Sequence, residues 1–586
     1  MNTEVSNKNV SLLTIDVGSV NTRAHLFEAV EGRYRFLAGS DTLSTIGSPA
    51  FDLNLGVLDA LQNLEGITGK TLLSERGVLV TTDSDDPVGA NAVVTTFSGG
   101  PSIKVVTVGL LESVSLSTIH KLIGTSYCEI VESFSLNDRR QSEIIIDAIC
   151  QKLPDLVAIG GGTNRGASRS VIRLANILAL AVSLIPKNQR PDILYAGNET
   201  LREEVDNLFG DLARVHFAEN VQPSLQTENL GPARKDLNRI FFEIQTRKLG
   251  GLQQLSDISG DLLYPNAHAF GRLVRFMSTV IDPPKGALGV DLGASNTSVA
   301  AATAGNLNLQ IYTRLGMGGG IKGMIEETLL AQVVRWLAIG LSENRVLDYL
   351  YNKALFPQSL PSSEEDLAIE QAAARQVLRT AMRRSLTMFD PKAIYPLPGK
   401  IPWFDRIIVS GSVVTRAPLL EDSLLMILDG IQPVGIATVI LDSNNLGAAI
   451  GASADIDPLL SIQVLETSAF VNLGTVITPT GSAREDNAVL RIQIKKDGQT
   501  AEFVEVKAGA LQTIPVANGE VVDVFVQPLQ NTNIGLGNGR GGWIRRVVGG
   551  LFGLVVDGRG RPIQLPTSFE RRQEKILSWK NALTKT

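Results

Sequence analysis

The chain has 586 residues, of which 44 % are hydrophobic and 19 % are charged, and its net charge is −6. This length exceeds what one hydrophobic core supports and predicts roughly three or four domains. The acidic balance argues against nucleic-acid binding, which needs clustered positive charge. Two cysteines are too few for a disulfide framework or a zinc site, so we expect a reducing compartment.

Neither a signal peptide nor a membrane span is expected. Residues 1–10 are polar and lack an apolar signal core. The longest apolar run, residues 174–186, is too short for a bilayer, which takes about 20 residues to cross. We expect a buried helix there and a cytoplasmic protein.

The first motif, residues 12–27, reads LLTIDVGSVNTRAHLF. An apolar strand ends at Asp16, a glycine turn with hydroxyl and amide side chains follows, and a second strand returns. Such a hairpin can wrap a phosphate with backbone and hydroxyl donors, while Asp16 holds a hydrated Mg²⁺. The predicted phosphate-binding residues are Gly18, Ser19, Asn21 and Thr22.

The next long stretch predicts an inserted α/β unit. Residues 154–179 and 190–210 each read as a strand, a glycine loop and a helix, which predicts a small parallel sheet. We assign residues 1–50 to the first half of a core and residues 51–260 to its continuation plus the insertion. The acidic run 83–91 is expected to be a solvated loop.

The first motif recurs at residues 288–299, which read LGVDLGASNTSV. Asp291 takes the place of Asp16, again between two apolar strands. Two such runs predict a duplicated core whose facing hairpins clamp a triphosphate and its metal, with Asp291 as the second metal ligand. The predicted phosphate-binding residues here are Gly293, Ala294, Ser295, Asn296 and Thr297.

A glycine-rich segment, LGMGGGIKGM, follows at residues 315–324. Gly318 and Gly319 could let a helix N-terminus approach the phosphates. The alternative is a flexible turn between a strand and a helix. Lys322 is expected to face solvent.

The repeated motif resembles the phosphate loops of the actin, sugar-kinase and Hsp70 superfamily. That resemblance implies an α/β fold with a duplicated ribonuclease-H-like (actin/Hsp70-like) ATPase core that binds ATP with Mg²⁺. It also implies an adenosine-binding motif in the second half, which we assign to residues 261–465. Residues 406–428 fit this motif as a strand, Gly411 and Ser412, and an amphipathic helix.

Longer segments look like the GlmL/MutL family, accessory proteins encoded beside coenzyme-B12-dependent glutamate mutase and unrelated to the mismatch-repair MutL. The resemblance runs from about residue 10 to about residue 465. It implies a chaperone-like reactivase that binds ATP and loosens a cobalamin-dependent mutase from inactivated cofactor. The segments that carry it are residues 95–110, 155–166, 193–205, 219–243 and 447–465.

The sequence departs from the family's pattern at several positions. Ala294 replaces a glycine, Asn296 a threonine, and Ser412 the second glycine of a pair. Each change removes a donor or clearance around a nucleotide. Asp16 and Asp291, which would manage Mg²⁺ and water and are our catalytic candidates, remain. Hydrolysis needs a general base that we cannot assign, so binding is favoured over turnover and a slow ATPase stays open.

The C-terminal part has a different character. Short alternating strands predict an antiparallel sandwich or barrel over residues 466–565, and residues 566–586 predict a helix and tail. The glycine-rich run 533–565 predicts a hairpin, with Trp543 as a contact residue. This module would serve partner docking or self-association. The arginines expected to form a basic patch on it are Arg540, Arg545, Arg546, Arg559 and Arg561.

Two other functions stay open. Actin-like proteins also act as non-catalytic scaffolds or filament subunits, which weakened phosphate loops plus an extra β module would suit. A small-molecule kinase is less favoured, because the insertion matches the GlmL type rather than a sugar-binding lobe.

Overall fold

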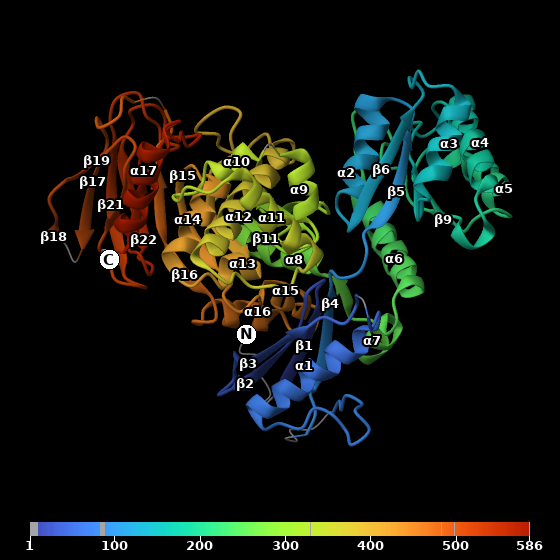
Figure 1. The fold of residues 1–586 in the computed structure, drawn as a ribbon, viewed down its shortest axis with the longest axis horizontal. Coiled ribbons are helices and arrows are strands. Elements are labelled where there is room, and N and C mark those ends of the chain that lie inside the picture. Colours follow the sequence, from blue (N-terminus) through green and yellow to red (C-terminus); the bar gives the residue numbers. More distant parts are fainter. Residues whose placement is uncertain are drawn as a thin grey trace, which may run out of the picture. The chain divides into compact units, whose positions relative to one another are not determined.

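The computed structural model describes residues 10–47, 49–82, 88–328, 330–481, 483–496 and 499–584. The chain divides into two compact units (Figure 1). One unit contains residues 1–44, 55–98 and 255–586, and the other contains residues 45–54 and 99–254. Most of the acidic run expected to be a solvated loop, residues 83–87, lies outside the described residues.

The first sheet runs in the order β3-β2-β1-β4-β10. Strands β1, β2 and β3 form an antiparallel meander, while β4 and β10 continue in parallel to β1. Every residue of β1 is buried because it is the central strand, whereas residues 33–39 of β3, at the edge, alternate between exposed and half-buried. The strands are β1 (Ser11–Val17), β2 (Asn21–Val30), β3 (Arg33–Leu43), β4 (Ala92–Phe97) and β10 (Leu263–Pro265).

The second sheet has the order β13-β12-β11-β14-β15-β16-β23-β20. Its first five strands repeat the order and directions of the first sheet, with an antiparallel meander β11-β12-β13 and two parallel strands. The α/β class with mixed sheets is confirmed. The strands are β11 (Gly286–Leu292), β12 (Thr297–Thr303), β13 (Asn306–Tyr312), β14 (Phe404–Ser410), β15 (Gly435–Leu441), β16 (Val471–Thr478), β20 (Leu511–Ile514) and β23 (Leu554–Asp557).

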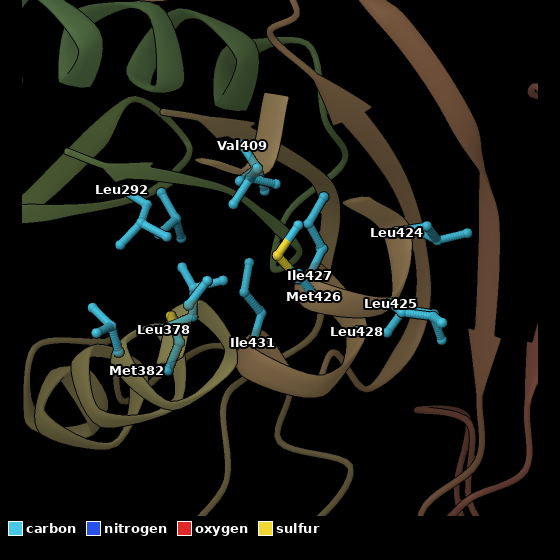
Figure 2. Close-up of a cluster of buried hydrophobic side chains, with 14 of the residues drawn as sticks. Leu292, Leu378, Met382, Val409, Leu424, Leu425, Met426, Ile427, Leu428 and Ile431 are labelled. Carbon is cyan, nitrogen blue, oxygen red and sulfur yellow. The ribbon is translucent and has the colours of Figure 1, made fainter. Parts of the chain in front are cut away.

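Helices cover these two sheets. Figure 2 shows part of the core of the second half, where Leu378 and Met382 gather with Ile431 and with Leu292 of β11. The helices of this unit are α1 (Leu53–Thr68), α7 (Leu252–Ile258, which crosses from the other unit), α8 (Asn266–Thr279), α9 (Ile321–Glu327), α10 (Ala331–Val334), α11 (Glu343–Leu355), α12 (Glu364–Arg384), α13 (Ser412–Thr415), α14 (Leu420–Ile431), α15 (Gly447–Ser453), α16 (Pro458–Leu465) and α17 (Phe569–Leu583).

The other unit contains an all-parallel sheet in the order β6-β5-β7-β8-β9. The longest apolar run forms most of α4, which buries one face in this unit's core. Within the described ranges, no helix combines the length and apolarity that crossing a bilayer would require. The elements are β5 (Ile103–Gly109), α2 (Ser117–Ile123), β6 (Cys128–Ser135), α3 (Ser142–Lys152), β7 (Leu156–Ile159), α4 (Arg169–Leu184), β8 (Asp192–Tyr195), α5 (Arg202–Phe209), β9 (Val215–Phe217) and α6 (Leu230–Lys248).

The C-terminal strands are shared between two sheets. An antiparallel sheet packs its apolar face against strands of the long second sheet, so that both line one core. The hairpin expected over residues 533–565 is wrong, because β22 pairs with β21 while β23 runs beside β16 in the other sheet. The antiparallel sheet contains β17 (Ala488–Lys496), β18 (Gln499–Thr500), β19 (Val504–Lys507), β21 (Val521–Pro528) and β22 (Gly542–Val548).

The expected basic patch is also wrong in part. Arg540, Arg545 and Arg546 are exposed, but the side chains of Arg559 and Arg561 are at most 1 % exposed. Both are buried because they follow β23, an interior strand, and pair with Asp557 at its end. A glycine-and-arginine composition could not distinguish these two environments.

Candidate functional site

The two motifs occupy equivalent places in the two sheets. Asp16 lies one residue before the end of β1, and Asp291 lies one residue before the end of β11. The turns that follow them meet, since the Ser295 hydroxyl donates a hydrogen bond to Ser19 Oγ over 2.9 Å. A cavity of about 900 Å³ opens beside these strand ends.

Most of the residues predicted from the sequence line this cavity. They are Asp16, Gly18, Ser19, Asn21, Asp291, Gly293, Ala294, Asn296, Gly411 and Ser412. Five others do not line it: Thr22, Ser295, Thr297, Gly318 and Gly319. The Thr297 hydroxyl, for example, donates to the Leu315 carbonyl over 2.8 Å, so it fixes the hairpin from behind.

The glycine-rich segment after β13 supports the second hairpin. A Cβ on Gly316 would lie 2.5 Å from the Ala294 carbonyl oxygen, and one on Gly320 would lie 2.4 Å from that of Ser295. The Gly318 N–H donates to the Ala294 carbonyl over 2.7 Å and is therefore already used. These contacts favour a strand-to-helix turn over a phosphate-binding helix end. Lys322 is exposed, as expected.

The Asp16 carboxylate is held by three donors. Oδ1 accepts hydrogen bonds from Thr96 Oγ1 at 2.7 Å and from Asn266 Nδ2 at 2.8 Å. Oδ2 lies 3.4 Å from Arg23 Nη1. Thr96 is the neighbour of Asp16 on the parallel strand β4, and Asn266 begins α8. Sequence analysis missed both, because nothing near them in the chain marks them as partners of an aspartate.

Arg23 is the main residue that sequence analysis missed. It faces Asp16 across the β1–β2 pair, its Nε lies 3.3 Å from Asp41 Oδ2, and its Nη2 donates to Ser412 Oγ over 2.9 Å. One guanidinium therefore joins the first half of the core to the turn after β14 in the second. The signal available in the sequence was a cation in the strand that returns from the first turn.

Asp291 differs from Asp16 in having no donor. Among the described residues none gives its carboxylate a hydrogen bond. Burial, together with the negative charges of Asp16 and Asp442, raises the pKa of Asp291 to about 7, while Arg23 opposes the rise. Asp442 follows β15 and is fully buried, where it accepts from Gly447 N at 2.8 Å and Ser410 Oγ at 3.0 Å.

The site therefore gathers Asp16, Asp291 and Asp442 near Arg23, whose guanidinium also pairs with Asp41. Repulsion among them would fall if a divalent cation lay near Asp16 and Asp291, and carboxylate oxygens are the ligands that Mg²⁺ prefers. On this test of the donor set, the residues present fit a bound Mg²⁺.

Polar groups from α11 and α12 line another part of the cavity. Lys353 Nζ lies 2.7 Å from Glu370 Oε1, and Glu370 and Gln371 follow each other on α12. Gln371 and Asn445 each have a buried amide nitrogen that finds no acceptor within the described residues. Nothing in the sequence motifs pointed to this wall.

Fold and site together define a class of protein: an α/β molecule whose core contains two sheets that share a five-strand order. A carboxylate lies near the end of the middle strand of each five, beside one cavity. The chain belongs to the MutL protein family, whose match covers residues 12–469. This confirms the resemblance to the GlmL/MutL family, the accessory family of glutamate mutase. The last 117 residues, 470–586, lie outside the match.

A curated relative and two solved structures are similar to the chain. Protein MutL of Clostridium tetanomorphum is 24 % identical over 330 residues, which cover 52 % of this chain and 68 % of the relative. A nucleotide-free acetone carboxylase structure has 12 % identity and a TM-score of 0.33, covering 86 % of this chain and 81 % of its own. A nucleotide-free diol dehydratase-reactivating factor has 11 % identity and a TM-score of 0.31, covering 76 % and 99 %. Because both TM-scores are below 0.5, the description of the fold rests on its strand order.

Proposed function

We propose that this protein binds ATP with Mg²⁺ in the cavity and acts as an accessory protein, of the reactivase or chaperone kind, for a coenzyme-B12-dependent mutase such as glutamate mutase. One observation carries the nucleotide part: Asp16 and Asp291 leave equivalent strands and face one cavity together with Arg23. Membership of the MutL family carries the accessory part.

Each group in the cavity has a proposed role. Asp16 and Asp291 hold Mg²⁺ through its water shell, and the ion offsets the charge of the phosphates. Arg23 and the hydroxyl and amide groups of Ser19 and Asn296 contact the phosphates. Gly411 and Ser412 lie against the adenosine. The cavity volume of about 900 Å³ lies within the range of ligand sites, about 300–1,000 Å³.

The link between the two halves supplies the proposed coupling to a partner. Arg23 in β2 donates to Ser412 after β14, so a phosphate that takes over the donors of Arg23 changes a contact between the halves. A nucleotide shifts such an equilibrium only as far as it binds one arrangement better than the other. We propose that this change in the arrangement of the two halves acts on a bound mutase and loosens it from inactivated cofactor.

Slow hydrolysis is part of the proposal only through Asp291. The Asp291 carboxylate takes no hydrogen bond from the described residues, so it can orient an attacking water of the Mg²⁺ shell, and this is the role we assign to it. No other carboxylate at the cavity is both raised in pKa and without a hydrogen-bond donor among the described residues.

A scaffold or filament protein with a degenerate nucleotide site is the second candidate. It is favoured by Ser412, whose side chain occupies the turn where an adenine would approach and already bonds to Arg23. The C-terminal module outside the family match would then serve self-association. Assembly that depends on nucleotide would support this candidate.

The deciding experiment is calorimetric titration of ATP with Mg²⁺ into the wild type and the Asp16→Ala and Asp291→Ala variants. Asp348→Ala serves as the matched control, because Asp348 is an exposed aspartate on α11 that does not line the cavity. We expect micromolar binding by the wild type and control, and at least about tenfold weaker binding by the other two. Absence of binding by the wild type would overturn the proposal. With binding shown, phosphate release with and without a B12-dependent mutase tests the accessory role.

A further inference from the structure

Arginines gather on one side of α12, away from the nucleotide cavity. Arg375, Arg379 and Arg383 are spaced four residues apart and so form one stripe along the helix. Helix α14 approaches closely beside this stripe, because a Cβ on Gly430 would lie 2.5 Å from Leu378 Cβ. The close approach brings Asp429 to Arg375, with 2.8 Å between Oδ2 and Nε.

The segment after β23 adds two more buried arginines to this cluster. Arg559 Nη1 lies 2.6 Å from Asp429 Oδ1, and its Nε lies 2.8 Å from Asp557 Oδ1. Arg561 Nη2 lies 2.8 Å from Asp557 Oδ2. Two carboxylates therefore serve three guanidiniums, Arg375 included, and all five side chains are at most 8 % exposed.

Two half-buried guanidiniums remain beside this network without a carboxylate. Arg379 has no hydrogen bond or ion pair with any described residue. Burial and the charges of Arg335, Arg383 and Arg561 lower its pKa to about 10 against the opposing charge of Asp429, which places these four cations near one another. Arg335 lies at the end of α10, which a 3.0 Å hydrogen bond from Gln376 to Gln332 fastens to α12.

Two buried hydrogen-bond donors without acceptors among the described residues belong to Arg335 and its neighbour Trp336. The Arg335 guanidinium lies over the Trp336 ring, 5.0 Å from its centroid. Arg335 Nε and Trp336 Nε1 are buried donors that have no acceptor within the described part of the chain. Buried donors and charges without partners are unfavourable, and a bound anion would satisfy both.

We propose that Arg335 and Arg379 form an anion site that takes a phosphate group, either inorganic or on a phosphomonoester. With Arg335, Arg379 and the exposed Arg383, the region contains six guanidiniums, of which only Arg375, Arg559 and Arg561 pair with Asp429 and Asp557 in the described part of the chain. This excess suits a multivalent anion, and the planar guanidinium fork matches phosphate oxygens. Neither Arg335 nor Arg379 lines the nucleotide cavity, so this site does not depend on the function proposed above.

The test measures binding of inorganic phosphate and of glycerol phosphate by calorimetry, and the thermal midpoint in phosphate against chloride of equal ionic strength. The variants are Arg379→Gln and Arg335→Gln. Arg540→Gln is the matched control, because Arg540 is an exposed arginine elsewhere. Arg23→Gln removes the cavity cation that contacts Asp16, and so helps to separate the two places where phosphate could bind.

We expect phosphate to bind the wild type and Arg540→Gln alike, and at least about tenfold more weakly when Arg379 or Arg335 is replaced, whether or not Arg23→Gln is also present. In chloride, Arg379→Gln should unfold at a higher temperature than the wild type, because an unpaired half-buried charge is gone. The tighter of the two probes identifies the source of the phosphate group. Loss of binding in Arg23→Gln alone, unchanged binding in both arginine variants, or an equal effect of chloride would overturn the proposal.

Discussion

The two aspartates of the repeated motif occupy equivalent positions but differ in their hydrogen bonding. Asp16 is oriented by Thr96, Asn266 and Arg23, whereas Asp291 takes no hydrogen bond from the described residues and has a pKa raised to about 7. The motif is the same in both halves, so the difference comes from what the neighbouring strands and helices bring to it. Asp291 therefore keeps a repulsion from the carboxylates of Asp16 and Asp442, which a bound cation would relieve.

Replacing Asp291 tests this repulsion in the absence of ligand. Its folded pKa of about 7 lies above the unfolded value of 3.8, so the folded state binds more protons between these values and stability falls as pH rises through them. Three pKa units would amount to about 4 kcal/mol. Because the side chain is partly exposed to the cavity, we expect Asp291→Asn to add about 1–2 kcal/mol at pH 8 and little at pH 4. Urea unfolding at both pH values measures this, and a gain independent of pH would contradict it.

At the scale of elements, the turn after β14 depends on Gly411. Its φ of 105° belongs to the region that favours glycine, and a Cβ there would lie 2.1 Å from the Leu292 carbonyl oxygen of β11. The close approach sets the distance between β14 and β11, and with it the position of Ser412 against Arg23.

We expect Gly411→Ala to destabilise the fold by about 2–4 kcal/mol, since backbone strain and a clash with backbone add together. It should also weaken ATP binding, because the turn moves. Gly399→Ala is the control: that glycine has a φ of 71° but nothing within 4 Å of its Cβ position, so strain alone should cost about 1–2 kcal/mol. Equal losses in the two variants, measured by urea unfolding, would show that the contact with Leu292 is unimportant.

The C-terminal strands show where local pattern stops being informative. Alternation of apolar and polar residues predicted strands correctly around residues 488–496 and 521–528. It did not predict that β22 and β23, separated by a glycine-rich turn, would join different sheets. Alternation records which residues face a core, but pairing is decided by which other strands offer a free edge.

For the whole molecule, the C-terminal segment is part of the second half rather than an attachment to it. Strands β16, β20 and β23 extend its sheet, and Trp579 and Leu583 of α17 lie in its core. This holds although the segment lies outside the family match. Trp543 of the same segment is instead 44 % exposed, and its ring centroid lies 5.4 Å from that of Phe525.

A pair of tryptophans tests this integration. Trp579 is 4 % exposed and its Nε1 donates to the Gly509 carbonyl, so Trp579→Ala should cost about 3–5 kcal/mol and shift the unfolding transition of the core formed by the second half. Trp543→Ala should cost much less, about 1 kcal/mol, because Trp543 is 44 % exposed and its ring packs on Phe525. Urea unfolding measures the stability of each variant, and calorimetric titration of the folded variants measures ATP binding. If the Trp579→Ala variant showed a second, separate unfolding transition and still bound ATP as the wild type does, the segment would be an independent domain.

The sequence by itself determined the two hairpins that follow Asp16 and Asp291, the α/β class and the family, because each depends on short runs of the chain: an apolar strand, an aspartate, and a glycine turn. Only the tertiary structure decided that Arg23 would meet Ser412, 389 residues away, and that Arg559 and Arg561 would be buried beside Asp557. Contacts between distant segments depend on how sheets and helices pack, and packing leaves no local pattern around either partner. The sequence therefore predicted the turns that line the site, whereas the charged side chains around those turns, such as Arg23, were found only in the structure.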